Sequence, residues 1–331
     1  MDEIKVAILD TGIGYSKYIP QKCIENEYIV KNGEINIGRA DDIDGHGTEC
    51  AFEIYRQCPD VKFTIIKVME KGIGTKENLG IALEYLCNLD VQIINMSLAY
   101  FSTKNKDDLY QKYIQIIEKD KVIIAALGNN KQRSYPAIYE NIIGVKGVEF
   151  QNNEIWFSEE NEIQCLCDNN TYICPGIYTE YELYPKSNSV ATARVTGIIA
   201  QKYLETQKKI NIDNTYNILK NIATKHWWNE KDIFENIRNP VWYREEKSDF
   251  WEIIKNIVKE YVKVDYKKWE NQGYCILGEK AGITYRECVS IIINIRKKIN
   301  INIDYFKCSR KIFASLYSLD KFVEEVINNE D

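Results

Sequence analysis

Four polar residues, far apart in the chain, have the side chains that acyl transfer needs. Asp10 and Asn129 each follow a β-rich run, and His46 lies between two glycines at the start of a helix-like stretch. Ser189 directly precedes another helix-like stretch. An acid, a base, a nucleophilic hydroxyl and an amide donor for an oxyanion together make a serine-based acyl-transfer site. Their chain order, Asp then His then Ser, distinguishes one lineage of such sites from the others.

Each of these residues also has an ordinary structural interpretation. Serine is a common helix N-cap, and asparagine after a glycine is a common turn residue. The turn after Asp10 contains Gly12-Ile13-Gly14, and a glycine-rich turn after a first strand can bind a dinucleotide. The third glycine of G-x-G-x-x-G is missing there. A nucleotide-binding α/β protein therefore stays open as an alternative.

The elements that must position these side chains alternate between two kinds. Strand-like runs cover residues 4–10, 61–69, 91–99, 121–127 and 141–149, and helix-like runs cover 48–58, 76–89, 109–120 and 190–204. This order predicts an α/β fold with a doubly wound, mostly parallel sheet. Ligands on such sheets bind at the carboxyl ends of the strands, where Asp10 and Asn129 are expected.

The motifs around these residues resemble those of the subtilisin-like serine proteases, the subtilases. The segment ILDTGIG is similar to that of the family's Asp, DGHGT to that of its His, AALGNN to its oxyanion segment and SNSVATARVTG to its serine motif. The resemblance covers about residues 4–226. It implies that Asp10 supports His46, that His46 activates Ser189, and that Asn129 and the Ser189 N–H hold the oxyanion.

The resemblance also implies two edge segments that bind substrate as an extended strand. The matching residues are Gly72, Ile73 and Gly74 on one side, and Ser97, Leu98 and Ala99 on the other. Tyr100 follows where the family tends to have glycine, so we expect it to narrow or cap a specificity pocket. The acidic residues Asp41, Asp42 and Asp44 are expected to form a solvated loop, and no calcium or other metal site is assigned.

The serine motif departs from the family at three positions. Ser187 and Asn188 replace its Gly and Thr, and Ala193 replaces its Pro. The side chain at 187 predicts a turn of different shape. Because all four chemical side chains are present, we expect an active enzyme, with a catalytically silent, subtilase-fold peptide-binding module as the alternative.

Composition restricts the setting. The net charge of −6 leaves no broad basic surface for nucleic acid, and no run of about 18 apolar residues predicts a membrane span. No signal peptide follows Met1, and there is no room for an N-terminal pro-segment, so a cytoplasmic protein is expected. The ten cysteines are then thiols. Cys165, Cys167 and Cys174 lack zinc-site spacing and are interpreted as buried apolar residues, and no cofactor is expected.

The last third of the chain has a different pattern. We expect a peptidase domain at 1–228, a linker at 229–247 and a helical accessory domain at 248–331. A helix with an apolar stripe follows Ser248, a capping box joins Thr284 to Glu287, and a last helix starts at Ser318. These features predict a small all-α bundle.

The segment ILGEKAGITYRECVSIIINIRKKININIDYF resembles an acyl or peptidyl carrier protein. Tyr285, with Thr284 beside it, takes the place of the family's pantetheine serine, so no phosphopantetheine arm is expected. The resemblance suggests binding to a partner protein or a leader peptide. An unrelated bundle that covers apolar surface is the alternative. The whole chain is thus predicted to be a serine endopeptidase with few substrates, a precursor peptide among the candidates.

Overall fold

The structure is a computed structural model that describes residues 3–102, 108–129, 133–150, 154–238 and 247–329. Contacts divide the chain into two units. One consists of Met1–Asn169, Pro175–Tyr178 and Ser187–Asn236, and the other of Asn170–Cys174, Thr179–Lys186 and Ile237–Asp331. The second unit is therefore discontinuous, which differs from the expected simple boundaries. Part of the expected linker is helix α6 (Glu230–Arg238), and residues 239–246 lie outside the described ranges.

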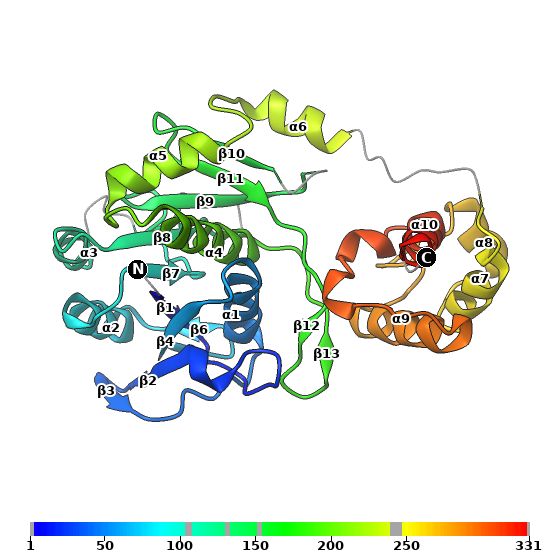
Figure 1. Cartoon of the computed structure of the whole chain (residues 1–331), viewed down its shortest axis with the longest axis horizontal. Coiled ribbons are helices and arrows are strands. Elements are labelled where there is room, and N and C mark those ends of the chain that lie inside the picture. Colours follow the sequence, from blue (N-terminus) through cyan, green and yellow to red (C-terminus); the bar gives the residue numbers. More distant parts are fainter. Residues whose placement is uncertain (1–2, 103–107, 130–132, 151–153, 239–246, 330–331) are drawn as a thin grey trace. The chain divides into compact units, whose positions relative to one another are not determined.

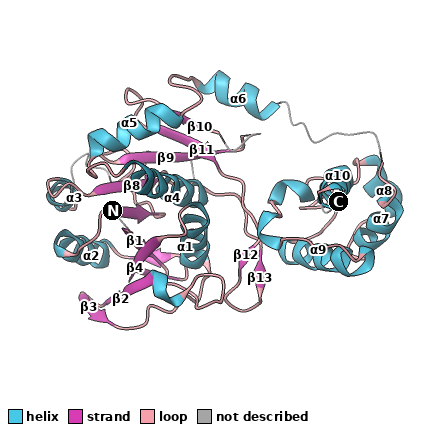
Figure 2. Cartoon of the chain, viewed as in Figure 1, coloured by secondary structure: helices cyan, strands magenta, loops and turns pink. Residues whose placement is uncertain are grey.

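A nine-stranded sheet forms the centre of the first unit, and Figure 2 shows its strands in magenta. Its strands are β1 (Ile4–Asp10), β2 (Ile24–Lys31), β3 (Glu34–Ile37), β4 (Val61–Lys67), β7 (Ile93–Met96), β8 (Val122–Ala126), β9 (Ile143–Val148), β10 (Ile155–Phe157) and β11 (Cys165–Asp168). Their spatial order is β10-β11-β9-β8-β7-β1-β4-β2-β3. Neighbours run parallel except at the two edges, β2–β3 and β10–β11. The predicted doubly wound, mostly parallel α/β fold is confirmed.

Helices cover both faces of this sheet, as Figure 1 shows, with α2 and α3 on one side and α1 and α4 on the other. Their bounds are α1 (His46–Gln57), α2 (Lys76–Asn88), α3 (Tyr110–Ile117), α4 (Asn188–Thr206) and α5 (Ile212–Ile222). The central strands are apolar on both faces because both are covered. Ala7 and Leu9 of β1, for example, pack in one cluster with Leu79 and Leu83 of α2.

Strand β1 lies at the point where the strand order changes direction. It pairs with β4 on one side and with β7 on the other, and both pairings are parallel. The carboxyl ends of β1 and β7 therefore meet at one edge of the sheet. Such a switch point leaves room for a ligand. Asp10 ends β1, and Ser97 follows directly after β7.

The C-terminal unit has its own apolar core. Its helices are α7 (Trp251–Lys259), α8 (Tyr266–Asn271), α9 (Tyr285–Ile299) and α10 (Leu316–Asn328). Ile173 and Leu183 belong to this core, although they come from the middle of the chain. The predicted capping box between Thr284 and Glu287 is present. The last helix begins at Leu316 with Ser315 as its N-cap, so the predicted start at Ser318 is wrong.

Among the described residues, four short strands lie outside the nine-stranded sheet, and three short 3₁₀ helices lie at Gln21–Cys23, Tyr305–Lys307 and Arg310–Phe313. The short strands are β5 (Met69–Glu70), β6 (Ile73–Gly74), β12 (Cys174–Pro175) and β13 (Tyr181–Glu182). β5 and β6 pair in an antiparallel hairpin close to the end of β4. In the ranges that the structure describes, no helix combines the length and apolar character needed to cross a membrane.

Candidate active site

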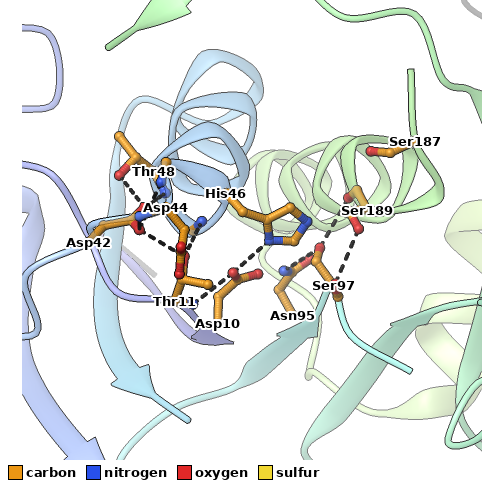
Figure 3. A network of polar contacts seen from close by, with 12 residues as sticks. Asp10, Thr11, Asp42, Asp44, His46, Thr48, Asn95, Ser97, Ser187 and Ser189 are labelled. Atoms are coloured by element: carbon orange, nitrogen blue, oxygen red, sulfur yellow. Dashed lines mark hydrogen bonds and ion pairs between the residues drawn. The ribbon is translucent and has the colours of Figure 1, made fainter. Parts of the chain in front are cut away.

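Asp10 and His46 form a close pair at the edge of the sheet. The Asp10 side chain is fully buried, and its Oδ1 lies 2.6 Å from His46 Nδ1. The Thr11 N–H donates to the same oxygen at 2.8 Å. Asp10 Oδ2 is buried and has no hydrogen-bond partner in the described part of the chain. Figure 3 shows the His46 ring between Asp10 and Ser189, so one edge of the imidazole remains for a second contact.

The charge of Asp10 controls the protonation of His46. Coulomb attraction to Asp10 raises the pKa of His46 to about 9; burial opposes this shift, and the Asp10 hydrogen bond adds to it. The His46 side chain is 33% exposed, so its free edge is accessible. A base must be neutral to accept a proton. The imidazole therefore becomes a base mainly at alkaline pH when the site is empty.

Asp42 is buried and holds the segments that carry Asp10 and His46. The prediction that it lies in a solvated loop is wrong. Its side chain is almost fully enclosed and accepts five hydrogen bonds. One comes from the Thr11 hydroxyl at 2.9 Å, and others come from the Thr48 N–H at 2.9 Å and the Thr48 hydroxyl at 2.7 Å. Asp42 thus joins the turn after Asp10 to the first turn of α1, which carries His46.

Sequence reasoning missed Asp42 because its neighbours Asp41 and Asp44 make the segment look like a polar loop. A signal was present, since an acidic residue just before a helix is a typical cap for free N–H groups. Burial acts to raise the pKa of Asp42, but the hydrogen bonds from Thr48, Asp44 and Gly45 outweigh it and hold the pKa below its usual value. The carboxylate is therefore charged when it binds them.

Two glycines of the motifs allow this close approach. A Cβ at Gly47 would lie 2.2 Å from the Gly12 carbonyl oxygen, and a Cβ at Gly12 would lie 2.2 Å from the Ala40 oxygen. Gly12 also has a φ of +114°, which side chains rarely adopt. The glycine next to His46 therefore lets the backbone after Asp10 pack against the start of α1.

Ser189 lies in the first turn of α4, next to the end of β7. Ser187 is the N-cap, and its hydroxyl accepts from the Val190 N–H at 3.2 Å. Ser189 is thus not needed as the cap. The Ser189 hydroxyl donates to the Ser97 carbonyl oxygen at 3.2 Å, and the Ser97 hydroxyl donates to the Ser189 carbonyl oxygen at 3.0 Å. In the described part of the chain, no hydrogen bond joins Ser189 to His46.

Asn95 supports this contact from inside the sheet. Its Nδ2 donates to the Ser97 hydroxyl at 3.1 Å, and its Oδ1 accepts from the Thr196 hydroxyl at 3.0 Å. Asn95 is fully buried in β7, and Thr196 is fully buried in α4. This residue was not predicted, although a lone amide inside an apolar strand is a usable signal, because buried polar groups need partners.

Asn129 lies after β8 and contacts the start of α4, so the structure brings it to the same edge as Ser189. Its Oδ1 accepts from the Asn188 N–H at 3.4 Å. This contact uses the acceptor oxygen of the amide, and the Nδ2 group is a donor. The Ser189 N–H belongs to the first turn of α4, whose N–H groups have no acceptor within the helix. These two donors have the chemistry to bind an oxyanion.

The two predicted substrate-binding segments meet around one cavity of about 270 Å³. Its lining contains six of the seven predicted residues: Gly72, Ile73, Gly74, Leu98, Ala99 and Tyr100. The seventh, Ser97, lies against Ser189 instead. Tyr100 is half-buried, and the Lys76 ammonium lies 4.8 Å from its ring centre. An aromatic side chain therefore forms part of the cavity wall.

A buried charge cluster joins the helices that carry His46 and Ser189. Arg194 of α4 is 3% exposed, and its guanidinium lies 2.7 Å from Glu53 of α1 and 3.1 Å from Asp168. Burial acts to raise the pKa of Glu53, but Arg194 and Arg56 outweigh it and hold that pKa below its usual value. Burial raises the pKa of nearby Glu49 to about 8. The cluster was not predicted from the sequence.

No metal or cofactor is assigned to this site. Ligand atoms of Asp10, His46 and Cys50 lie within 4.8 Å of one another, and they are the only such group in the described ranges. Asp10 and His46 already bind each other. Burial also raises the pKa of Cys50 well above its usual value, which disfavours the thiolate that a metal needs. Cys165, Cys167 and Cys174 are buried and form no disulfide with the described residues.

Comparison with known proteins decides the family. A model of the subtilase family matches residues 1–232. The chain belongs to the subtilase family. Subtilisin DY of Bacillus licheniformis is 28% identical to this subtilase over 229 residues, covering 60% of this chain and 77% of its own. This subtilase is a serine endopeptidase, and the family match ends before the C-terminal helices.

Solved structures agree with this fold. The epidermin leader peptide processing serine protease of Staphylococcus aureus superposes on this subtilase with a TM-score of 0.54 at 15% identity, covering 66% of this chain and 69% of its own. The nisin leader peptidase of Lactococcus lactis gives a TM-score of 0.53 at 17% identity, covering 72% and 89%. The resemblance of the C-terminal segment to carrier proteins lies outside the residues that the family model matches and stays a prediction.

Proposed function

We propose that Asp10, His46 and Ser189 form the catalytic triad of this subtilase and that its substrate is a precursor peptide. The observation that carries the triad is the 2.6 Å contact between Asp10 and His46 at the sheet edge where Ser189 begins its helix. Asn129 and the Ser189 N–H act as the oxyanion donors. Asp10 holds the imidazole in the tautomer that leaves Nε2 free for Ser189.

The reaction follows from these roles. Ser189 Oγ attacks the carbonyl carbon of the scissile peptide, and His46 Nε2 takes the hydroxyl proton. The carbonyl oxygen becomes an oxyanion and accepts hydrogen bonds from Asn129 and the Ser189 N–H. His46 then gives its proton to the leaving nitrogen, the C–N bond breaks, and water releases the acyl group by the same steps.

The Ser97 carbonyl connects substrate binding to this chemistry. It accepts the Ser189 hydroxyl in the empty site, at 3.2 Å. It also lies on the segment proposed to pair with an extended substrate, which would supply a main-chain N–H to it. Binding of substrate then releases the Ser189 hydroxyl towards His46. Contacts between catalytic groups are commonly loose before substrate binds.

A fluorophosphonate probe tests the triad directly. Wild-type protein at pH 9 is expected to be labelled at Ser189, as mapped by mass spectrometry, and His46→Ala and Ser189→Ala are expected to lose the label. Ser187→Ala is a matched control, since it removes a neighbouring hydroxyl that serves only as a helix cap. A folded wild type that stays unlabelled would contradict the triad and favour a peptide-binding module without turnover.

The substrate class is drawn from the similar structures and from the cavity. Two structures with this fold are described as leader peptide proteases. Tyr100 in the cavity wall favours a restricted set of substrate side chains. Profiling with a library of synthetic peptides is expected to show few cleaved sequences, and Tyr100→Gly is expected to accept larger side chains at one position. An unchanged profile in that variant would remove Tyr100 from the specificity determinants.

We also propose a cellular location and a binding partner for this subtilase. Ten free cysteines, eight of them buried, suit a reducing compartment, and we place the protein in the cytoplasm. The C-terminal unit is proposed to bind a partner protein or the leader of the substrate. Fractionation of cells that produce the protein tests the first point. Pull-down of synthetic leader peptides by the full chain, with and without changes on α9, tests the second.

A further inference from the structure

Asn188 precedes Ser189 and uses its whole side chain to bind backbone of the sheet. Its Nδ2 donates to the Leu127 carbonyl at 2.7 Å and to the Gly128 carbonyl at 3.4 Å. Its Oδ1 accepts from the Gly147 N–H at 2.8 Å. The side chain therefore bridges the end of β8 and strand β9 from the first turn of α4.

Gly147 leaves space for this bridge because it has no side chain. A Cβ on Gly147 would lie 3.1 Å from Asn188 Oδ1 and 2.6 Å from the Asn169 side chain. A side chain at 147 would therefore clash with Asn169 and crowd the Asn188 amide. Glycine at this position lets both side chains approach β9 closely.

The segment that Asn188 binds leads directly to the proposed oxyanion donor. Leu127 is also held by its N–H, which donates to the Val145 carbonyl at 2.9 Å, and the Gly128 N–H donates to the buried Ser134 hydroxyl at 2.7 Å. The Asn188 N–H contacts the Asn129 Oδ1 at 3.4 Å. Both carbonyls before Asn129 and the Asn129 amide itself are thus tied to the residue that precedes Ser189.

This arrangement differs from what the family residue could do. Threonine, which the family has at this position, offers one short hydroxyl. Asparagine offers two donors and an acceptor in one plane, and only such a group can bridge two carbonyls and an N–H. The departure from the family motif is therefore compensated by a contact that the motif residue does not make.

We propose that Asn188 is a positioning residue that holds the segment Leu127–Asn129, and with it the Asn129 amide, at a fixed distance from Ser189. The proposal rests on the proposed roles of Ser189 and Asn129. Asn188 itself touches no reacting atom. Its effect is to keep the two oxyanion donors, the Asn129 Nδ2 and the Ser189 N–H, aimed at one point, which is the geometry that electrostatic stabilisation needs.

A double-mutant cycle with Asn129 tests the positioning role, with the rate of fluorophosphonate labelling as the readout. Asn129→Ala is expected to lower the rate by about 10²–10³-fold, as for loss of one oxyanion donor. Asn188→Asp keeps the acceptor for Gly147 but loses both donors, and is expected to lower the rate at least tenfold. If Asn188 acts through Asn129, the double variant is expected to be labelled at most about threefold more slowly than Asn129→Ala.

Two results overturn the proposal. One is an Asn188→Asp rate within twofold of wild type. The other is a double variant in which the two losses multiply, because a merely structural role lowers the rate independently of Asn129. Urea unfolding of each variant at the labelling pH shows whether the protein is folded when the rate is measured.

Hydrogen exchange by NMR keeps the bridge testable even if the protein does not react. The Gly147 N–H is expected to exchange slowly in wild type and in Asn188→Asp, and at least tenfold faster in Asn188→Ala, which has no acceptor. Equal exchange in all three proteins overturns the bridge itself. A protein that shows the bridge but no labelling at Ser189 contradicts the triad, so the two failures are distinguishable.

Discussion

At the level of single residues, the charge of Asp10 determines when His46 can act as a base. The Asp10 carboxylate lies 2.6 Å from the imidazole and raises its pKa to about 9. The reactivity of Ser189 should therefore depend on pH in a way that an isolated histidine would not produce.

The rate of fluorophosphonate labelling is expected to rise with pH and to reach half its maximum near pH 9. Asp10→Asn removes the charge, so the half-maximum should move towards about 6.5, and the rate should fall by about 10⁴-fold because the tautomer is wrong. Labelling rates between pH 6 and pH 10.5 check both statements. A wild-type half-maximum at or below pH 7 would contradict the first.

The same attraction affects stability. A raised pKa in the folded state means that His46 stabilises the fold fully below about pH 6.5, and that this contribution is lost as the pH rises through about 9. Urea unfolding at pH 6 and pH 10 should show this loss in wild type and a smaller one in His46→Gln. An equal loss of the free energy of unfolding in the two proteins would contradict the raised pKa of His46.

Asp42→Asn tests the anchor beneath the pair. The neutral amide cannot accept all the bonds that Asp42 accepts from Thr11, Thr48 and the backbone, so the free energy of unfolding should fall by about 1–3 kcal/mol. Labelling of Ser189 should also slow, because His46 is on the helix that Asp42 holds. Asp41→Asn is the matched control, since the exposed Asp41 carboxylate pairs with Arg39, and it should change the free energy of unfolding by less than about 0.5 kcal/mol. A similar loss of stability in both variants would contradict the role of Asp42 in holding the start of α1.

The residues of the proposed triad could be named from the sequence, whereas the residues that support them could not. Asp10, His46 and Ser189 follow recognisable local patterns. Asp42 was misjudged because its burial depends on Thr11, which is 31 residues away and reaches it only in the folded chain. Arg194 was missed for the same reason, since its partners lie on other elements.

At the level of elements, helices α1 and α4 carry the proposed base and the proposed nucleophile and are joined by buried charges. Arg194 of α4 binds Glu53 of α1 and Asp168 of β11 with little exposure to solvent. Charges of this kind are costly to leave unpaired. The relative position of His46 and Ser189 therefore depends on a cluster that does not itself react.

Arg194→Met is expected to lower the free energy of unfolding by about 3–5 kcal/mol, because Asp168 and Glu53 both lose a buried ion pair, although Glu53 keeps its pair with Arg56. Arg39→Met, which breaks an exposed pair with Asp41, should lower it by no more than about 1 kcal/mol. Urea unfolding at pH 7 compares the two. A loss below 1 kcal/mol for Arg194→Met would mean that the carboxylates find other partners or become protonated.

The central elements were predictable because buried parallel strands are continuous apolar runs. Strand β1 has the predicted bounds, and α1, α2 and α4 lie within one or two residues of theirs. The edge strands β2 and β3 were missed because their exposed faces are polar and break the apolar run. The start of α10 was wrong because two serines three residues apart, Ser315 and Ser318, both suit a cap, and the Ser318 N–H donates to Ser315.

At the level of the whole molecule, the second unit takes part of its core from the middle of the chain. The Ile173 N–H donates to the Cys308 carbonyl at 2.9 Å, and the Arg310 N–H donates to the Thr171 carbonyl at 2.8 Å. The Tyr181 and Tyr305 rings lie 4.7 Å apart. Such contacts between distant segments leave no trace in local pattern, so no boundary near 170 was predicted.

Removal of residues 239–331 should expose this middle segment. Ile173 and Leu183 would lose the apolar core that buries them, so we expect the shortened chain to bind a hydrophobic dye, to aggregate and to unfold at lower urea than the full chain. Ile173→Ser together with Leu183→Ser should reduce dye binding in the shortened chain. A shortened chain with full stability and no dye binding would show that residues 170–186 pack without the C-terminal helices.

The discontinuous second unit also has a consequence for the time at which the enzyme is completed. Leu183 lies six residues before Ser189, and it is buried among side chains of helices that are synthesised about 70 or more residues later. The segment that leads into the nucleophile therefore emerges long before the residues that enclose it. We expect a nascent chain to lack a settled active site until the C-terminal helices have been synthesised, so the order of translation would itself delay proteolysis.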